Sequence, residues 1–325
     1  MAGRFVDVAF SIDENFAKQG AVVLASLAAV ADPDSHYRVH LLGDDLTPST
    51  RRELRRIAED AGIELRLVEV DDKAIRALPE LSGKTRPAYF RLLLPEILDG
   101  VADRVLYVDA DTVFCADPAE LIDVELHGRA FAAVRSGWSP WLCCEGGPPN
   151  WRELGLDPRA PYFNSGVLVM DVAAWREENL SERSFAFLSD NRDTMTLMDQ
   201  QALNSVVQGE WAELPPRWNQ QEYVFSPTGL ARVIWTEEEV REAIDEPGII
   251  HYLGLHKPWM SAGNHPQSQR WFDALDTTKW VGWRPEERSP AAAAYNRLVV
   301  AWRVIRHGSI KGRSKAPSRH GRPVR

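Results

Sequence analysis

The chain has 325 residues, of which 44% are hydrophobic and 26% charged. These ordinary globular values exclude a disordered, collagenous or coiled-coil protein, and the longest strongly apolar run, residues 21–31, is shorter than the roughly 20 residues that span a bilayer. The net charge is −9. The residues after Glu287 include no acidic group and ten Lys or Arg, so the preceding part of the chain is strongly acidic. A strongly acidic protein body argues against a nucleic-acid partner.

The N-terminus and the cysteines indicate the compartment. Asp7 interrupts the apolar stretch of the opening sequence MAGRFVDVAF, so we expect no signal peptide. The three cysteines, Cys115, Cys143 and Cys144, include an adjacent pair and do not form a disulfide framework. The sequence therefore predicts a cytoplasmic protein.

Strand and helix patterns alternate through the first 110 residues. We expect strands at 5–11, 36–42, 63–70 and 104–108, and helices at 16–31, 47–61 and 88–98. This alternation predicts an α/β fold with a mostly parallel sheet and right-handed crossovers. Ligands of such sheets bind beyond the carboxyl ends of the strands.

The second half is less regular and carries all twelve tryptophans, the first of which is Trp138. Residues 136–162 show little periodicity and predict a long loop, after which residues 162–171 return to strand character. Residues 288–308 predict an amphipathic helix, and residues 309–325 a basic, disordered tail.

Two carboxylates follow the fourth predicted strand in the run Val108-Asp-Ala-Asp-Thr112. In an extended segment, side chains two residues apart point to the same side, so Asp109 and Asp111 can converge on one divalent cation. Such a pair also occurs by chance in solvated turns. However, two neighbouring carboxylates repel each other unless a cation or a proton relieves them.

A second segment of interest runs from His251 to Trp259. The imidazole of His251 with two carboxylates makes an oxygen-rich site with one nitrogen, which suits Mn²⁺ or Mg²⁺. Gly254 permits a ligand to approach the backbone, and Lys257 supplies a point charge for phosphate. Taken alone, this segment is typical of a structural loop.

These segments are two of six motifs that occur in the order found in glycosyltransferase family 8, which includes bacterial lipooligosaccharide galactosyltransferases and glycogenin. The motifs are Phe10-Ser-Ile-Asp-Glu-Asn15, Tyr89-Phe-Arg-Leu92, Leu106-Tyr-Val-Asp-Ala-Asp111, Phe163-Asn-Ser-Gly-Val167, Asp199-Gln-Gln201 and the segment from His251 to Trp259. The chain resembles this family from Val6 to Trp259, about four fifths of its length.

The resemblance implies a GT-A fold, a Rossmann-like sheet followed by an irregular acceptor-binding part. It implies one catalytic domain over residues 1–287, with a nucleotide-binding half at 1–112 and an acceptor half at 113–287. The donor would be a UDP-sugar, and a hexose would pass with retention of anomeric configuration to a saccharide or lipid-linked acceptor.

The resemblance also implies roles for single residues. Mn²⁺ or Mg²⁺ would be held by Asp109, Asp111 and His251. The residues expected to contact the donor are Ser11, Asp13 and Asn15 at the uridine end, Gly254 and Lys257 at the diphosphate, Arg91, Asn164, Ser165, Asp199 and Gln200 around the sugar, and Asp109 with Ala110 beside them.

Arg91, Asp199 and Gln200 are the catalytic candidates. UDP is a good leaving group whose developing charge a divalent metal and Lys257 can meet, so no general acid is required, in contrast to glycosidases. Gln200 matches the position expected of a nucleophile, but an amide is a poor nucleophile. We therefore favour same-face attack, in which the leaving phosphate takes the acceptor's proton, although a covalent intermediate stays open at this point.

Several candidates also have a structural alternative. The alternatives are helix capping for Asp13, Asn15 and Asp199, an ion pair with Glu96 on a helix surface for Arg91, and a turn at the start of a strand for Asn164. Trp259 is expected in the core rather than as a platform for a sugar ring.

One departure from the family concerns the strand at residues 131–134. Some relatives carry an acidic residue after it, near the sugar pocket, whereas this chain has Arg135-Ser136, so the donor sugar stays open. The tryptophans of the loop 136–162 (Trp138, Trp141 and Trp151) are expected to help shape the acceptor site over the donor. The alternative is a local hydrophobic cluster.

Two other functional classes compete with the transferase. A catalytically silent nucleotide-sugar-binding protein would not need the paired aspartates, His251 and Lys257. A nucleotidyltransferase would be expected to show a Gly-rich phosphate loop with a basic residue after the first strand, and residues 11–20 lack one. The amphipathic helix and basic tail predict peripheral contact with an anionic membrane, or else a helix packed on the domain.

Overall fold

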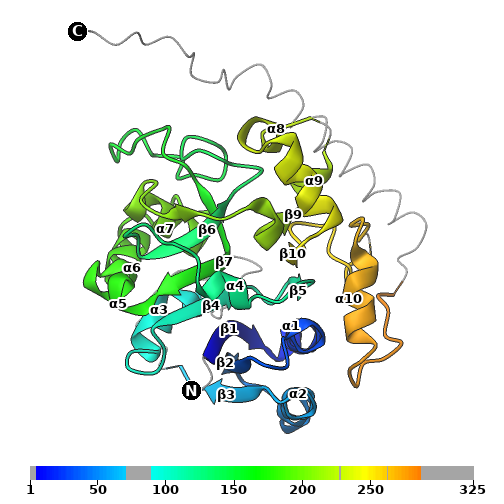
Figure 1. Cartoon of the computed structure of the whole chain (residues 1–325). Coiled ribbons are helices and arrows are strands. Elements are labelled where there is room, and N and C mark those ends of the chain that lie inside the picture. Colours follow the sequence, from blue (N-terminus) through cyan, green and yellow to red (C-terminus); the bar gives the residue numbers. More distant parts are fainter. Residues whose placement is uncertain (1–4, 71–88, 227, 262, 287–325) are drawn as a thin grey trace.

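The computed structural model describes residues 5–70, 89–226, 228–261 and 263–286 (Figure 1). Its strands are β1 (Phe5–Asp13), β2 (His36–Asp44), β3 (Glu64–Val68), β4 (Arg104–Val108), β5 (Thr112–Phe114), β6 (Phe131–Arg135), β7 (Phe163–Asp171), β8 (Ala212–Glu213), β9 (Gln220–Gln221) and β10 (Ile249–His251). Its α-helices are α1 (Ala17–Val30), α2 (Pro48–Asp60), α3 (Phe90–Ile97), α4 (Ala119–Ile122), α5 (Val172–Glu177), α6 (Leu180–Asp190), α7 (Met198–Val207), α8 (Ala231–Ile234), α9 (Glu237–Asp245) and α10 (Ser268–Leu275).

The main sheet has seven strands in the order β3-β2-β1-β4-β7-β6-β8. Strands β1 to β4 run parallel to one another, which confirms the predicted α/β fold, whereas β7 runs antiparallel to both β4 and β6. A second sheet, in the order β5-β10-β9, lies beside it. The mixed sheet follows from the irregular second half, where a loop rather than a crossover helix joins β6 to β7.

Helices cover both faces of the main sheet (Figure 1). Val8 and Phe10 of β1 belong to the core cluster that includes residues of α1 and α2, and the alternate residue Ala9 belongs to the cluster with α3, α5, α6 and α7. In β7, Val169 and Met170 divide between the same two clusters. Because both faces are buried, these strands read as nearly continuous apolar runs.

The direction of β7 brings two motifs to one edge of the sheet. Because β7 is antiparallel to β4, Val108 at the end of β4 pairs with Val167 in the middle of β7. In the second sheet, His251 at the end of β10 pairs with Thr112 at the start of β5. The residues at the carboxyl ends of β4 and β10 therefore lie beside the amino-terminal half of β7, at Gly166.

The observed boundaries refine the predicted elements. The helix expected at residues 16–31 begins at Ala17, because a single 3-10 turn (Glu14–Phe16) precedes it and Asp13 caps that turn. The helix expected at 88–98 is described as Phe90–Ile97, with Pro95 inside it. The strand expected at 104–108 has the predicted bounds.

The predicted long loop 136–162 has a small core of its own. Its two arms are joined by hydrogen bonds from Ser136 N to Tyr162 O (2.9 Å) and from Leu142 N to Ala160 O (3.0 Å). Leu142, Ala160 and Tyr162 are buried together, and Trp151 packs against them. The alternative of a local hydrophobic cluster therefore holds for Trp151.

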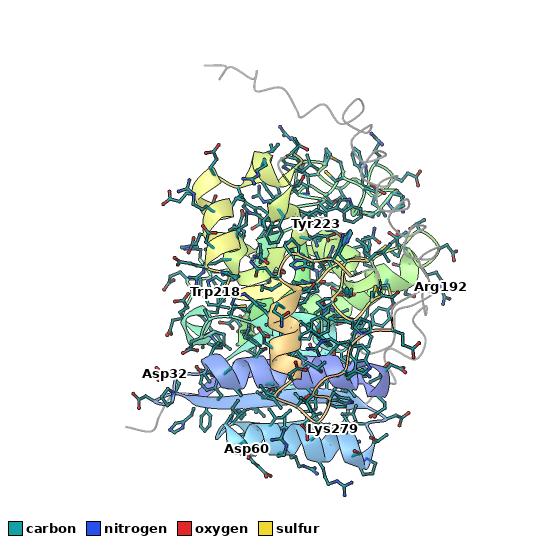
Figure 2. All side chains as sticks on the ribbon, turned by 90° about the vertical axis from the view of Figure 1, so that its right-hand side faces the viewer. Asp32, Asp60, Arg192, Trp218, Tyr223 and Lys279 are labelled. Carbon is teal, nitrogen blue, oxygen red and sulfur yellow. The ribbon has the colours of Figure 1, made fainter. Side chains whose placement is uncertain are left out.

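The end of the described chain packs across the first helices. In Figure 2, α10 lies in front of α1, and Lys279 lies close to α2. The backbone N–H of Lys279 donates to Glu53 Oε1 (2.7 Å), and its Nζ donates to Ser49 Oγ (2.9 Å). The helix expected at 288–308 and the tail at 309–325 lie outside the described residues. Within the described residues, no helix has the length and apolarity needed to cross a bilayer.

Candidate active site

Asp109 and Asp111 lie in the tight turn between β4 and β5. The strand ends at Val108, so the two residues do not form the extended segment assumed from the sequence. The turn is closed by a hydrogen bond from Thr112 Oγ1 to Asp109 O (2.8 Å). Their carboxylates nevertheless converge, because one ligand atom from each of Asp109, Asp111 and His251 lies within 4.8 Å of the others.

The His251 ring is buried and faces both aspartates. Its Nε2 lies 3.0 Å from Asp111 Oδ1 and 3.8 Å from Asp109 Oδ2, and its Nδ1 lies 2.9 Å from Asn219 Oδ1. The ring lies against the bare backbone of β7 at Gly166. A Cβ added there would be 2.1 Å from His251 Cε1 and 2.9 Å from Asp109 Oδ2, so this position of the motif has room only for glycine.

This donor set fits a divalent cation. Two carboxylates and one imidazole nitrogen are ligands that Mn²⁺ accepts readily. Burial disfavours the charged form of Asp111, but Lys257 and His251 outweigh burial and hold the pKa of that carboxyl well below its usual range. The Asp111 ligand is thus kept ionised in a cationic environment, as metal binding requires.

Arg91 of α3 contacts several of the residues that are expected to surround the donor sugar. Its guanidinium donates to Asp109 Oδ1 (2.6 Å) and Ser165 O (2.6 Å), and its Nε lies 3.1 Å from Asp199 Oδ2. Burial opposes its charge, but Asp109 and Asp199 outweigh burial and raise the pKa of Arg91. Arg91 is 5% exposed, so the alternative of a surface ion pair with Glu96 is wrong.

Asp199 is buried in the first turn of α7. The helix begins at Met198, so Asp199 is not its N-cap, and that alternative is wrong. Ser165 Oγ donates to Asp199 Oδ2 (3.1 Å), which ties the turn to β7. Met198 has φ +46°, a left-handed conformation that is strained for a residue with a side chain.

Gln200 and Asn164 are joined by their amides. Asn164 Nδ2 and the backbone N–H of Ser165 both donate to Gln200 Oε1, each at 3.1 Å. Gln200 Nε2 lies 3.4 Å from the hydroxyl of Tyr162. Asn164 is therefore part of a buried network and not a simple turn residue.

The predicted uridine-contacting residues lie at the end of β1. Ser11 Oγ is 3.3 Å from the Tyr107 hydroxyl, which donates to Asp109 Oδ1 (2.9 Å), so Ser11 is linked to the paired carboxylates. Asp13 Oδ1 accepts from Phe16 N (3.1 Å), which confirms capping by Asp13, and Asn15 donates to the other oxygen of Asp13 (3.5 Å). Asn15 itself is exposed and does not cap.

The predicted diphosphate-contacting residues lie on the loop after β10. Gly254 has φ +62° and supplies the left-handed backbone of that loop. Lys257 Nζ lies 2.5 Å from Asp111 Oδ2. Ala110, between the two aspartates, is buried. Trp259 is half-buried and packs against the core residue Trp271, with ring centroids 5.2 Å apart.

At the position where some relatives have an acid, the chain forms an ion pair. Arg135 Nη2 donates to Glu213 Oε2 of β8 (2.6 Å). Burial raises the pKa of Glu213, although Arg135 opposes this shift. The acidic group at this edge thus comes from a different strand and is paired with a cation.

Three residues of the site were not among the sequence candidates: Tyr107, Gly166 and Asn219. Tyr107 lies two residues before Asp109, and alternation along the strand could have placed it on the same side. Gly166 belongs to the motif Phe163–Val167, but the reason that only glycine fits there is the His251 ring, which comes from β10. Asn219 ends a single 3-10 turn (Pro216–Asn219) between β8 and β9, which is too short for a period to predict which side chains point inward.

The chain is similar to known proteins over most of its length. Residues 7–263 match the family described as Glycosyl transferase family 8. General stress protein A of Bacillus subtilis is 27% identical over 271 residues (82% of this chain, 92% of the relative). The lipopolysaccharide 1,3-galactosyltransferase of Salmonella typhimurium is 26% identical over 282 residues (84% and 79%).

Solved structures show the same fold. The galactosyltransferase LgtC, crystallised with donor and acceptor sugar analogs, superposes with a TM-score of 0.70 over 87% of this chain and 98% of its own, at 23% identity. At that identity the likeness concerns the fold, and it confirms the expected GT-A architecture. Since the family match covers most of the chain and all six motifs, the chain belongs to glycosyltransferase family 8.

Proposed function

We propose that this protein is a metal-dependent retaining hexosyltransferase that transfers a hexose from a UDP-sugar to a saccharide or lipid-linked acceptor. The observation that carries the proposal is the convergence of Asp109, Asp111 and His251 within 4.8 Å, beside the cations Arg91 and Lys257. Such an arrangement suits a diphosphate whose charge must be met as the sugar departs.

In this proposal Asp109, Asp111 and His251 hold Mn²⁺ or Mg²⁺, which when bound neutralises charge on the diphosphate. Residues 1–112 form the nucleotide-binding half, and residues 113–287 the acceptor half. The remaining donor contacts are Ser11, Asp13 and Asn15 at the uridine, Ala110, Gly254 and Lys257 at the diphosphate, and Arg91, Asn164, Ser165, Asp199 and Gln200 at the sugar.

The arrangement of Gln200 supports same-face attack. Its Oε1 already accepts two hydrogen bonds, from Asn164 and Ser165, so both lone pairs of this oxygen are engaged. In the proposed step, the bond between the anomeric carbon and the phosphate oxygen breaks, and the acceptor oxygen bonds to that carbon on the same face. The acceptor's proton passes to the departing phosphate, so no protein base is needed.

The acceptor side is proposed to include the loop 136–162. This loop is anchored on the turn that carries Asp199 and Gln200, because Gln201 Nε2 donates to Gly147 O (2.9 Å). Trp138 and Trp141 are half-buried and leave ring surface for a sugar. Shortening the loop tip should then reduce transfer far more than donor hydrolysis, and equal loss of both would favour a purely local cluster.

The name of the Salmonella relative supports a hexose donor and a lipid-linked saccharide acceptor. An acceptor of that kind would make membrane contact useful, and residues 288–325 carry ten basic and no acidic side chains. We propose peripheral contact of this segment with anionic lipid. Sedimentation with anionic vesicles at low salt, with and without residues 288–325, tests it, and failure of both forms to sediment would contradict it.

The experiment that tests the function is UDP release from a panel of UDP-sugars with Mn²⁺, with and without saccharide acceptors. A transferase releases UDP from one sugar class, and acceptor accelerates the release. A silent binding protein binds UDP-sugar without releasing UDP. A nucleotidyltransferase instead makes or cleaves the nucleotide-sugar at its diphosphate, with pyrophosphate as co-substrate or product.

A further inference from the structure

A series of hydrogen-bonded amides, from Gln200 through Asn164 to Asn219, connects the proposed sugar site to the proposed metal site. Asn164 Nδ2 donates to Gln200 Oε1 (3.1 Å), and Asn219 Nδ2 donates to Asn164 Oδ1 (2.9 Å). Asn219 Oδ1 then faces His251 Nδ1 at 2.9 Å. Asn164, Asn219 and His251 are each at most 8% exposed, so water cannot easily take the place of a missing partner.

Two backbone N–H groups fix the direction of every hydrogen bond in this series of amides. The N–H of Gly166 points at Asn164 (3.1 Å), so the atom it meets must be the amide oxygen. The N–H of Ser165 points at Gln200 (3.1 Å) and identifies that oxygen in the same way. A backbone N–H can only donate, so neither amide can be reversed without setting two donors against each other.

The orientation of Asn164 also determines which atom of Asn219 faces His251. Because Asn164 presents its oxygen, Asn219 must present its amino group there and its oxygen to the ring. An oxygen facing Nδ1 requires that Nδ1 carries the proton of the neutral ring. The lone pair is then on Nε2, the atom that faces Asp109 and Asp111.

We propose that Asn219 is a positioning residue that fixes the Nδ1–H tautomer of His251, with Asn164 and the Gly166 N–H as the source of its orientation. Nε2 is thereby kept free to bind the divalent cation. A partner on the second ring nitrogen of a metal-binding histidine sets both the tautomer and the ring orientation. This inference rests on the proposed metal site. It adds residues that contact or orient the metal-binding side chain of His251 and do not contact the metal itself.

The same hydrogen bonds predict that Gln200 does not control the tautomer of His251. Asn164 is oriented by Gly166 independently of Gln200. Removing the Gln200 amide should therefore leave the proton on His251 Nδ1, although it removes a proposed contact to the sugar.

The first test is ¹⁵N NMR of the histidine ring nitrogens in the full-length protein saturated with Mg²⁺, a diamagnetic ion. His251→Gln identifies the signals. The proposal predicts a proton on Nδ1 and none on Nε2, both in the wild type and in Gln200→Ala. An Nδ1 without a proton in the wild type would overturn it.

The second test is the affinity for Mn²⁺ alone, measured by electron paramagnetic resonance of the free ion. Asn219→Ala should weaken binding about 10- to 100-fold, the usual cost of losing the outer partner of a metal-binding histidine. Asn219→Asp still accepts from Nδ1–H but cannot donate to Asn164, so it should bind Mn²⁺ within about threefold of the wild type.

The matched control is Gln220→Ala. Gln220 is the adjacent residue, is equally buried, and donates to Ala243 O rather than to the amide chain. It should lower thermal stability without changing Mn²⁺ affinity. If Gln220→Ala weakens Mn²⁺ binding as much as Asn219→Ala does, the effect is one of general destabilisation and the proposal is wrong.

The two proposals can fail separately. If the tautomer and the Mn²⁺ affinities behave as stated but no UDP-sugar is turned over, the transferase proposal fails and the positioning role stands. If UDP-sugar is turned over with Mn²⁺ while Asn219→Ala leaves both the tautomer and the affinity unchanged, the positioning role alone fails.

Discussion

Lys257 Nζ lies 2.5 Å from Asp111 Oδ2, so the cation proposed for the donor's diphosphate is paired with a carboxylate proposed for the metal. One carboxylate oxygen cannot serve both partners equally well. Binding of a divalent ion with a diphosphate would give Lys257 a new anionic partner, and the two cations would then share the added negative charge.

Replacing Lys257 should therefore have opposite effects on two ligands. In Lys257→Ala, the affinity for Mn²⁺ alone should rise about tenfold, because a competing cation is removed, and the affinity for UDP should fall about tenfold or more. Calorimetric titration measures both. Lys279→Ala, which removes a lysine bonded to Ser49 away from the site, should change neither. Weaker binding of Mn²⁺ alone in Lys257→Ala would contradict this account.

Gly166 should be intolerant of any side chain. In Gly166→Ala the new Cβ would stand 2.1 Å from His251 Cε1, so the ring must shift and the three ligands separate. Mn²⁺ affinity should fall at least about tenfold, with a stability cost of about 1–3 kcal/mol from overpacking. Gly128→Ala is the control, because it strains a backbone with φ +74° where a Cβ meets open space. Wild-type affinity in Gly166→Ala would show that the ring is not held there.

Arg91 should matter for stability as well as for transfer. Arg91→Ala leaves Asp109 and Asp199 without their shared buried cation and should cost about 3–5 kcal/mol in chemical denaturation. Arg56→Ala removes a half-exposed arginine and should cost at most about 1 kcal/mol. Adding Asp199→Asn to Arg91→Ala should recover part of the loss. Equal costs for the two arginine variants would refute the assigned role.

The fold was predictable where one rule of periodicity applied. The strand at 104–108 and the alternating strands and helices around it follow from apolar runs that both faces of the sheet bury. The antiparallel direction of β7 was missed, because strand direction depends on how the loop 136–162 returns the chain. The capping alternative for Asp199 failed because α7 begins one residue earlier, at Met198, whose left-handed conformation no propensity favours.

The site was predictable only in part. Asp109, Asp111 and His251 follow from the family motifs, whereas the extended segment assumed for the two aspartates is a turn. Asn219 could not be found in this way, because its role depends on a ring from β10 and an amide from β7 meeting a segment without periodicity. Sequence spacing carries no information about such meetings between elements distant along the chain.

Glu53 links α2 to the end of the described chain and gives a pH dependence. Its hydrogen bond with Arg56, helped by the Lys279 N–H and opposed by burial, lowers the pKa of Glu53 below its ordinary 4.5. Because the folded-state pKa is lower than the unfolded one, the stabilisation is full at neutral pH and is lost as the pH falls below about 4.5.

Glu53→Gln should accordingly be less stable than the wild type by about 1 kcal/mol at pH 7, since Arg56 is half-exposed and the pair is screened. The difference should shrink as the pH falls from 5 to 3 in urea denaturation series. Glu64→Gln, at an exposed pair with Arg66, should show a smaller difference at every pH. A gap that widens in acid would contradict the assigned direction.

The most direct test of the central claim is the rate of UDP release from the accepted UDP-sugar by Asp109→Ala and Asp111→Ala, beside a chelator-treated wild type. We predict that both variants keep the fold and lose about a thousandfold or more of the rate. The wild type should lose activity on chelation and recover it when Mn²⁺ is added. The control Asp60→Asn, at an exposed carboxylate of α2 labelled in Figure 2, should keep near-normal activity. Full activity in excess chelator, or in either aspartate variant, would contradict the claim that these residues hold a catalytic metal.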